Sequence, residues 1–213
     1  MASFVIAVDG PAGSGKSSVS KEVARRLDFG YLDTGAGYRA FALHFLANSE
    51  MVLSELLDSY EYEISLDPNA QLVILNGADV TRAIREESAA SAVSEIAREP
   101  KVRQLQMEDA RSRISKCSNP GIVVEGRDIT TVVAPDAQLR ILLTASEAVR
   151  LRRRGLEATE SAANLKARDA SDSKVVEFFE PAPGVKLLDT SELDFEQSVQ
   201  AVLKLVEAVQ NDR

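Results

Sequence analysis

A glycine-rich stretch near the N-terminus has the residue types that bind a nucleotide phosphate. Residues 10–17 read GPAGSGKS and match the pattern G-x-x-x-x-G-K-[ST] at every fixed position. In this pattern backbone N–H groups converge on a phosphate, the lysine reaches the β and γ oxygens, and the Ser or Thr hydroxyl can ligate Mg²⁺. We therefore expect Lys16 to be catalytic, Ser17 to contact the metal, and the triphosphate to lie on Gly10, Pro11, Ala12, Gly13, Ser14, Gly15, Lys16, Ser17 and Ser18.

The neighbouring sequence supports this interpretation of the glycine-rich stretch. Residues 3–8, SFVIAV, are almost continuously apolar and predict a buried strand that leads into the loop. Apolar residues then recur with helical spacing from Val19 to Leu27. The motif thus lies between a predicted strand and a predicted helix, as a phosphate-binding loop of this type requires. A GTPase is disfavoured, because the chain has no Asn-Lys-x-Asp motif for reading guanine.

Two arginines follow predicted strand ends, where open α/β sheets bind their ligands. Arg39 ends the stretch DTGAGYR at residues 33–39, and Arg127 stands in GRDI at residues 126–129. A planar guanidinium can bind two oxygens of a phosphate at once. Each arginine could instead form a surface salt bridge, but the position after a strand end favours a place in the ligand site.

The rest of the chain predicts an α/β fold. Apolar runs at residues 121–124, 139–143 and 185–188 predict three more buried strands, separated by helical stretches rich in Ala, Glu and Arg. This alternation predicts a parallel sheet covered by helices on both faces. Residues 189–191, DTS, should cap a last helix, one face of which carries Phe195, Val199, Val202, Val206 and Val209.

One segment departs from this alternation. Tyr62, Ile64 and Leu66 alternate with polar residues, and DPNA at residues 67–70 turns the chain into the apolar run 72–75. The pattern predicts a β-hairpin. We expect residues 1–213 to form a single domain, into which a small lobe is inserted at about residues 58–85.

Composition narrows the function classes. The chain has 213 residues, of which 45% are hydrophobic, enough for one substantial core. A formal net charge of -8 argues against nucleic acid or an acidic membrane as a partner. The chain contains neither a membrane-length apolar run nor a secretory signal, so we expect a cytoplasmic protein. Cys117 is the only cysteine, which excludes an intrachain disulfide.

Several motifs together resemble the bacterial cytidylate kinases. They are residues 33–39 and 126–129, with TVV at 131–133 and PDA at 135–137 close behind. The resemblance runs from about Val5 to Thr190. It implies a P-loop nucleoside monophosphate kinase with a short lid at about residues 150–168, which uses ATP and Mg²⁺ to phosphorylate CMP and dCMP. We expect such a kinase to be a monomer with small-molecule substrates.

The resemblance also implies roles for individual residues. Base recognition falls on Ser94, Arg103 and Asp128, while Asp172 matches a contact to the ribose hydroxyls. In the basic cluster at residues 150–154, Arg150 and Arg154 lie one helical turn apart and are the expected catalytic arginines, together with Arg127; Arg153 is held in reserve. The acceptor-binding set is then Asp33, Arg39, Ser94, Arg103, Arg127, Asp128, Arg168 and Asp172.

The chain departs from the family pattern at four places. Val175 stands where an arginine is usual, and Lys174 beside it supplies a charge without a planar bidentate group. Gly37 replaces a larger apolar residue, Thr130 a glycine, and Ala134 an aromatic residue. Two alternatives therefore stay open: a kinase of the same fold for UMP, AMP or shikimate, and a nucleotide-binding regulatory protein that has lost turnover.

Overall fold

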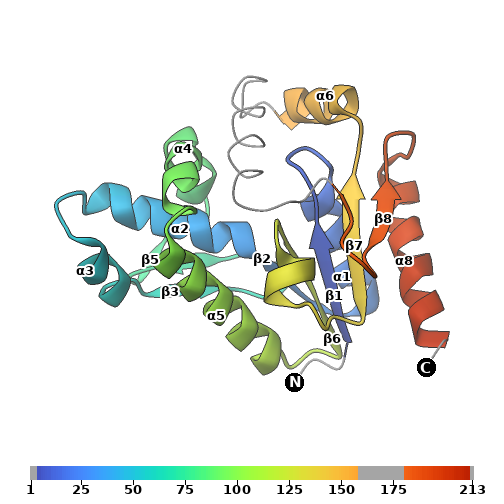
Figure 1. Ribbon diagram of the computed structural model, residues 1–213, viewed down its shortest axis with the longest axis horizontal. Helices are drawn as coiled ribbons and strands as arrows, with labels where there is room; N and C mark the ends of the chain where they lie inside the picture. The colour runs from blue at the N-terminus through green and yellow to red at the C-terminus, as the bar shows by residue number, and fades with distance from the viewer. Residues whose placement is uncertain (1–3, 158–179, 212–213) are drawn as a thin grey trace.

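The structure, a computed structural model, describes residues 4–157 and 180–211, without the side chains at positions 154, 156 and 157. Its main feature is a five-stranded parallel sheet with the spatial order β2-β6-β1-β7-β8 (Figure 1). The strands are β1 (Phe4–Asp9), β2 (Gly30–Asp33), β6 (Gly121–Gly126), β7 (Leu139–Thr144) and β8 (Lys186–Asp189). The predicted parallel sheet is confirmed.

Helices cover both faces of this sheet. The helical elements are α1 (Lys16–Leu27), α2 (Thr34–Ala47), α3 (Leu53–Asp58), η1 (Ala83–Arg85), α4 (Glu87–Ile96), α5 (Pro100–Lys116), η2 (Ile129–Val133), α6 (Glu147–Glu157) and α8 (Phe195–Asn211). η2 is a single π-helical turn. Of the helices in the described ranges, none combines the length and apolar character needed to cross a membrane.

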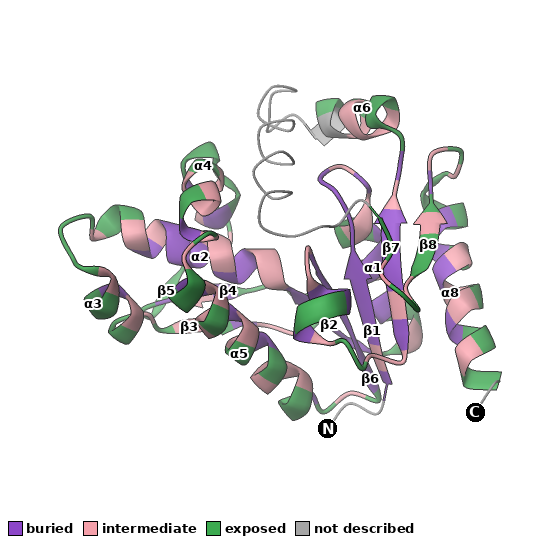
Figure 2. Ribbon diagram, in the orientation of Figure 1, coloured by how far each residue is buried: buried purple, intermediate pink, exposed green. Residues whose placement is uncertain are grey.

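Successive side chains of the strands point to opposite faces of the sheet and pack into two separate hydrophobic cores. Ile6 and Val8 of β1 face a cluster that contains Val23 of α1 and Val202 of α8. Ala7 faces the opposite cluster, to which α2, α5 and η2 contribute. Strands β1, β2, β6 and β7 are accordingly buried along most of their length (Figure 2). The phosphate loop (residues 10–17) follows the central strand β1. It therefore lies in the middle of the row formed by the carboxyl ends of the parallel strands.

The predicted hairpin is present. β3 (Tyr62–Ile64) and β4 (Val73–Leu75) pair antiparallel, with Tyr62 opposite Leu75. A third short strand, β5 (Ala78–Asp79), continues the small sheet through a two-residue turn. The turn residues Asn76 and Gly77 have φ values of 48° and 77°, as tight hairpin turns require.

The structure adds bounds to one strand and corrects the prediction for another. β2 is the strand expected before Arg39; its bounds could not be predicted, because its four residues GYLD are too few for a periodicity and follow the end of α1 closely. β8 was predicted to be buried, but it lies at the edge of the sheet, and Leu187 is 55% exposed. An apolar run does not distinguish an edge strand from a central one.

The cap of the last helix also differs from the prediction. Asp194 Oδ1 accepts a hydrogen bond from the Gln197 N–H at 2.7 Å, and the Gln197 side chain accepts from the Asp194 N–H at 3.0 Å. This reciprocal pair starts α8, whereas residues 189–191 precede it. Phe195 is 51% exposed and stays outside the core that Val199, Val202 and Val206 enter.

Candidate active site

The phosphate loop connects β1 to α1 by glycines in left-handed conformations. Gly13 and Gly15 have φ values of 76° and 90°. A Cβ on Gly13 would lie 2.8 Å from the carbonyl oxygen of Arg150, so this position requires glycine for its conformation and for the approach of α6. The predicted strand, loop and helix are therefore confirmed.

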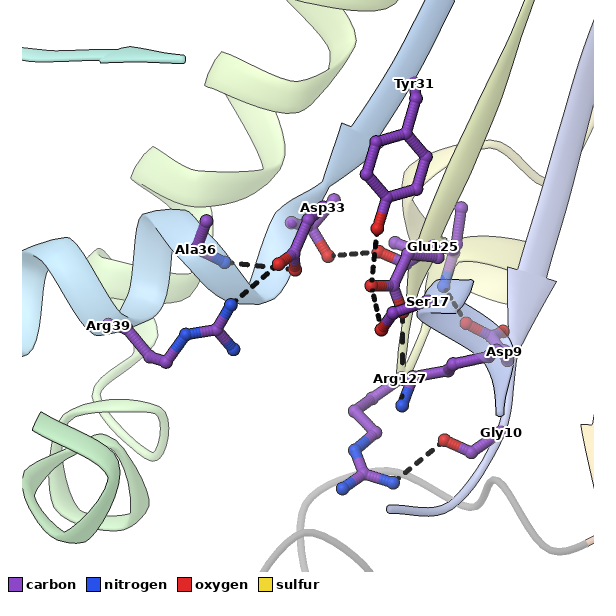
Figure 3. A network of polar contacts seen from close by, with 12 residues as sticks. Asp9, Gly10, Ser17, Tyr31, Asp33, Ala36, Arg39, Glu125 and Arg127 are labelled. Carbon is purple, nitrogen blue, oxygen red and sulfur yellow. Dashed lines mark hydrogen bonds and ion pairs between the residues drawn. The ribbon is translucent and has the colours of Figure 1, made fainter. Parts of the chain in front are cut away.

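A buried carboxylate lies beside the loop. Ser17 Oγ donates to Glu125 Oε1 at 2.6 Å, Tyr31 OH donates to the same atom at 3.2 Å, and Lys16 Nζ lies 3.9 Å from Oε2 (Figure 3). Burial raises the pKa of Glu125, the charge of Asp33 raises it further, and Lys16 opposes both effects. The carboxylate thereby orients the two residues expected to contact the triphosphate and the metal.

Sequence analysis did not identify Glu125, although a signal was present. The residue ends the apolar run of β6 and pairs in register with Val8 of the central strand. An acidic residue at the end of a buried strand next to the phosphate loop is well placed to act near a metal ion. In the described part of the chain, no cluster of three or more His, Cys, Asp or Glu side chains could hold a metal alone.

Arg39 and Arg127, which the family resemblance assigns to an acceptor phosphate, have different partners: Arg39 pairs with Asp33, and Arg127 contacts the phosphate loop. Arg39 Nη2 pairs with Asp33 Oδ2 at 2.7 Å, and Asp33 Oδ1 caps α2 by accepting from the Ala36 N–H at 3.2 Å. Burial lowers the pKa of Arg39, but the charges of Asp33 and Glu125 raise it more. Arg127 Nη1 donates to the carbonyl oxygen of Gly10 at 2.8 Å (Figure 3).

A cavity of about 320 Å³ is lined by Tyr38 and Asp128, the sequence neighbours of these two arginines. Arg103 and Asp128 line it and form an ion pair, with 2.7 Å between Nη2 and Oδ2. Burial raises the pKa of Tyr38 to about 12, and the charge of Asp128 contributes to the shift. Ser94 lies on α4 and is not among the described lining residues, which are Thr34, Tyr38, Arg103, Gln104, Gln106, Met107, Ala110, Asp128, Val132 and Val133.

Asp9 connects the end of β1 to the turn that follows Asp128 in the sequence. Its carboxylate accepts hydrogen bonds from the N–H groups of Ile129 at 2.8 Å and Thr130 at 2.9 Å. Burial raises the pKa of Asp9, while the hydrogen bonds from Thr130 and Ile129 lower it. Asp9 could not be singled out from the sequence, because its partners lie 120 residues away in the chain.

The basic cluster of α6 meets the phosphate loop through Arg150 and Arg153. Arg150 Nη1 donates to Ala12 O at 3.0 Å, and Arg153 Nη1 donates to Ser14 O and to Thr190 Oγ1, each at 3.0 Å. Arg153 was the reserve candidate, and Thr190 was missed because it was taken for a helix cap. Arg154 belongs to α6, but its side chain lies outside the description. Arg168, Asp172, Lys174 and Val175 also lie outside the described residues.

Comparisons with known proteins identify the family. A model of the family described as cytidylate kinase matches residues 6–208. A cytidylate kinase from Cutibacterium acnes is 40% identical over 215 residues, covering 95% of this chain and 96% of its own length. One from Desulfitobacterium hafniense is 41% identical over 214 residues, covering 94% of this chain and 91% of its own length.

Among solved structures, a gluconokinase from Sinorhizobium meliloti has a similar fold. Its TM-score is 0.56 at 14% identity, and the match covers 98% of this chain and 94% of the other. At that identity the likeness speaks for the P-loop kinase fold alone. Family membership rests instead on the sequence matches, which span nearly the whole chain. The chain belongs to the cytidylate kinase family.

Proposed function

We propose that this protein transfers the γ-phosphoryl group of ATP to CMP and dCMP with the help of Mg²⁺. The observation that carries the proposal is the position of two consecutive residues. Arg127 donates to Gly10 of the phosphate loop, and Asp128 lines the neighbouring cavity. One turn of chain thus joins a donor site to an acceptor site.

On the donor side, Lys16 serves the β and γ phosphates, and Arg150 and Arg154 neutralise charge on ATP. The site fits Mg²⁺, because this ion is commonly held by a few protein oxygens together with substrate phosphates. Ser17 Oγ is such an oxygen, and Glu125 at 2.6 Å orients it. The ion would neutralise charge that develops on the transferred group.

On the acceptor side, Arg39 and Arg127 hold the phosphate of CMP in line with ATP, and Arg103 and Asp128 read its base. The carboxylate of Asp128 can accept from the exocyclic amine of cytosine, and Arg103 can donate to its ring acceptors. Ser94, Asp33, Arg168 and Asp172 complete the acceptor set proposed from the family resemblance. No protein nucleophile is needed, because phosphoryl transfer depends on positioning and charge neutralisation.

We also propose that the inserted lobe extends over about residues 58–85 and that the lid covers about residues 150–168. The protein is then one kinase domain that acts as a monomer in the cytoplasm. UMP, AMP or shikimate as acceptor, and a regulatory role without turnover, are the less favoured alternatives.

The test is ADP release measured in parallel with CMP, dCMP, UMP and AMP. We expect turnover with CMP and dCMP that exceeds turnover with the other acceptors. Lys16→Ala should abolish it while thermal unfolding stays close to that of the wild type, because Lys16 lies outside the core. Equal use of UMP would contradict the proposed acceptor, and an inactive wild type would favour the regulatory alternative.

A further inference from the structure

Gln106 is a buried polar residue whose amide nitrogen has no hydrogen-bond partner among the described residues. The side chain lines the acceptor cavity, and the residue is only 6% exposed. Nε2 makes no hydrogen bond within the part of the chain that the structure describes. A buried donor without a hydrogen bond costs more free energy than an ordinary hydrogen bond contributes. Such a group is therefore expected to have a functional role that offsets this cost.

Gly37 makes room for this amide. A Cβ at position 37 would lie 2.2 Å from Gln106 Oε1, far inside any real contact. Gln106 and the missing side chain of Gly37 therefore occupy the same space. Position 37 is one at which the chain departs from the pattern it resembles, and Gln106 fills the space that a larger residue there would need.

The packing also indicates which end of the amide remains available. Oε1 points at Gly37, and the carbonyl oxygen of Gly37 already accepts from Tyr60 OH at 3.0 Å. The Gln106 side chain also lowers the pKa of the neighbouring Tyr60 hydroxyl, against the larger effect of burial. Nε2 is thus an enclosed donor on a side chain that lines the cavity, and it makes no hydrogen bond of good geometry among the described residues.

Position on the helix indicates what the donor meets. Gln106 follows Arg103 by three residues on α5, so both side chains lie on one face of that helix and both line the cavity. Arg39 and Arg127, proposed to hold the acceptor phosphate, are not among the described lining residues. The base is therefore the part of the acceptor nearest Gln106.

We propose that Gln106 is a specificity-determining residue, whose amide donates a hydrogen bond to the N3 ring nitrogen of the pyrimidine base. The inference rests on the proposed function and deepens it. O2 is an acceptor in both cytosine and uracil, but N3 is an acceptor in cytosine and an N–H donor in uracil. An amide donor directed at N3 consequently favours cytosine.

The test is the dissociation constant of CMP in Gln106→Leu, with steady-state KM for CMP, UMP and ATP beside it. We expect CMP binding about three- to tenfold weaker, the range of one neutral hydrogen bond, with the KM for ATP unchanged and less preference for CMP over UMP. Tm should be unchanged or higher, because the substitution removes an unsatisfied donor. Gln200→Leu on the exposed face of α8 is the matched control.

A double-mutant cycle with Gly37 adds a second readout. Gly37→Ala alone should weaken CMP binding to a similar extent, because the new methyl displaces the amide. In the Gln106→Ala background the same change should have little further effect, since the space is then free. Additive losses would mean that Gly37 acts independently of Gln106 and would overturn the pairing.

The outcomes separate this inference from the proposed function. A wild type active on CMP, whose Gln106→Leu variant binds CMP equally well, overturns the role of Gln106 alone. So does a Gln106→Leu variant with a lower Tm and equal losses for CMP and ATP, because that result describes packing. A wild type without CMP-dependent turnover overturns both.

Discussion

Thr130 donates its hydroxyl to Asp9 Oδ2 at 2.6 Å, across 121 residues of sequence. The bond is buried and joins the strand before the phosphate loop to the turn after Arg127 and Asp128. In the family pattern that this chain resembles, position 130 is usually glycine, which could donate only its backbone N–H to Asp9. The hydroxyl bond is therefore an additional connection in this chain between the donor and acceptor sides of the site.

Thr130→Val should destabilise the protein, because it removes this bond at nearly constant shape. Hydrogen bonds to charged groups contribute about 1.5–3 kcal/mol, and we expect a loss of that size in the free energy of unfolding. Denaturant unfolding at neutral pH measures it. Thr131→Val, at the neighbouring exposed position, is the control. Equal midpoints for the two variants would show that the hydroxyl contributes nothing.

Glu125→Gln should separate stability from activity. Burial raises the pKa of Glu125. Holding this side chain in its charged form at neutral pH therefore reduces the stability of the nucleotide-free fold. The amide should raise Tm, yet lower kcat by about 10- to 100-fold, the usual cost of losing a partner that orients a metal ligand. Glu207→Gln on the surface of α8 serves as control. A lower Tm would show that the charge pair with Lys16 outweighs its burial.

Asp128→Asn should act on the acceptor alone. We expect the KM for CMP to rise by about 10- to 100-fold while the KM for ATP stays within a few-fold, because the carboxylate lies in the cavity and is proposed to accept from the cytosine amine. Steady-state kinetics with each substrate varied in turn give both values. The exposed Asp136→Asn is the control. Equal losses for both substrates would assign Asp128 a structural role.

The ion pair between Arg26 and Glu196 should make part of the stability depend on pH. Two hydrogen bonds of 2.7 and 2.6 Å join α1 to α8, and Arg26 lowers the pKa of Glu196 from 4.5 to about 2. A lowered carboxyl pKa adds stability that is complete above 4.5 and is lost as the pH falls towards 2.

Arg26→Ala should therefore lower Tm at pH 7, and the difference from the wild type should shrink across that acid range. Because both side chains are solvent-exposed, the effect should also weaken in 1 M salt, a concentration at which the Debye length is about 3 Å. Thermal unfolding at several pH values and two salt concentrations provides the test. A difference independent of both would point to lost packing of the arginine stem.

Local patterns were sufficient to predict the donor side. The motif at residues 10–17 carries its own strand and helix, so sequence placed Lys16 and Ser17 correctly within the strand-loop-helix unit. The alternation around Tyr62 predicted the hairpin because period 2 is visible in a few residues. In each case the information lies within a short segment of chain.

The remaining features depend on contacts between distant segments. Glu125 matters because the sheet order brings β6 beside β1, and Arg153 matters because α6 returns to Ser14. Neither relation leaves a spacing in the sequence. Asp194 was missed as the cap of α8 for a different reason, since residues 189–191 carried an equally good capping composition three positions earlier. Composition alone could not choose between the two.

The acceptor cavity has a consequence for inhibition. Its ten described lining residues all come from α2, α5 and the turn around η2, whereas ATP is expected on the loop between β1 and α1. A compound that fills the cavity would compete with CMP and would not have to displace cellular ATP. Five of the ten lining residues lie on α5, so such a compound would depend mainly on contacts with this helix and not on contacts with the phosphate loop.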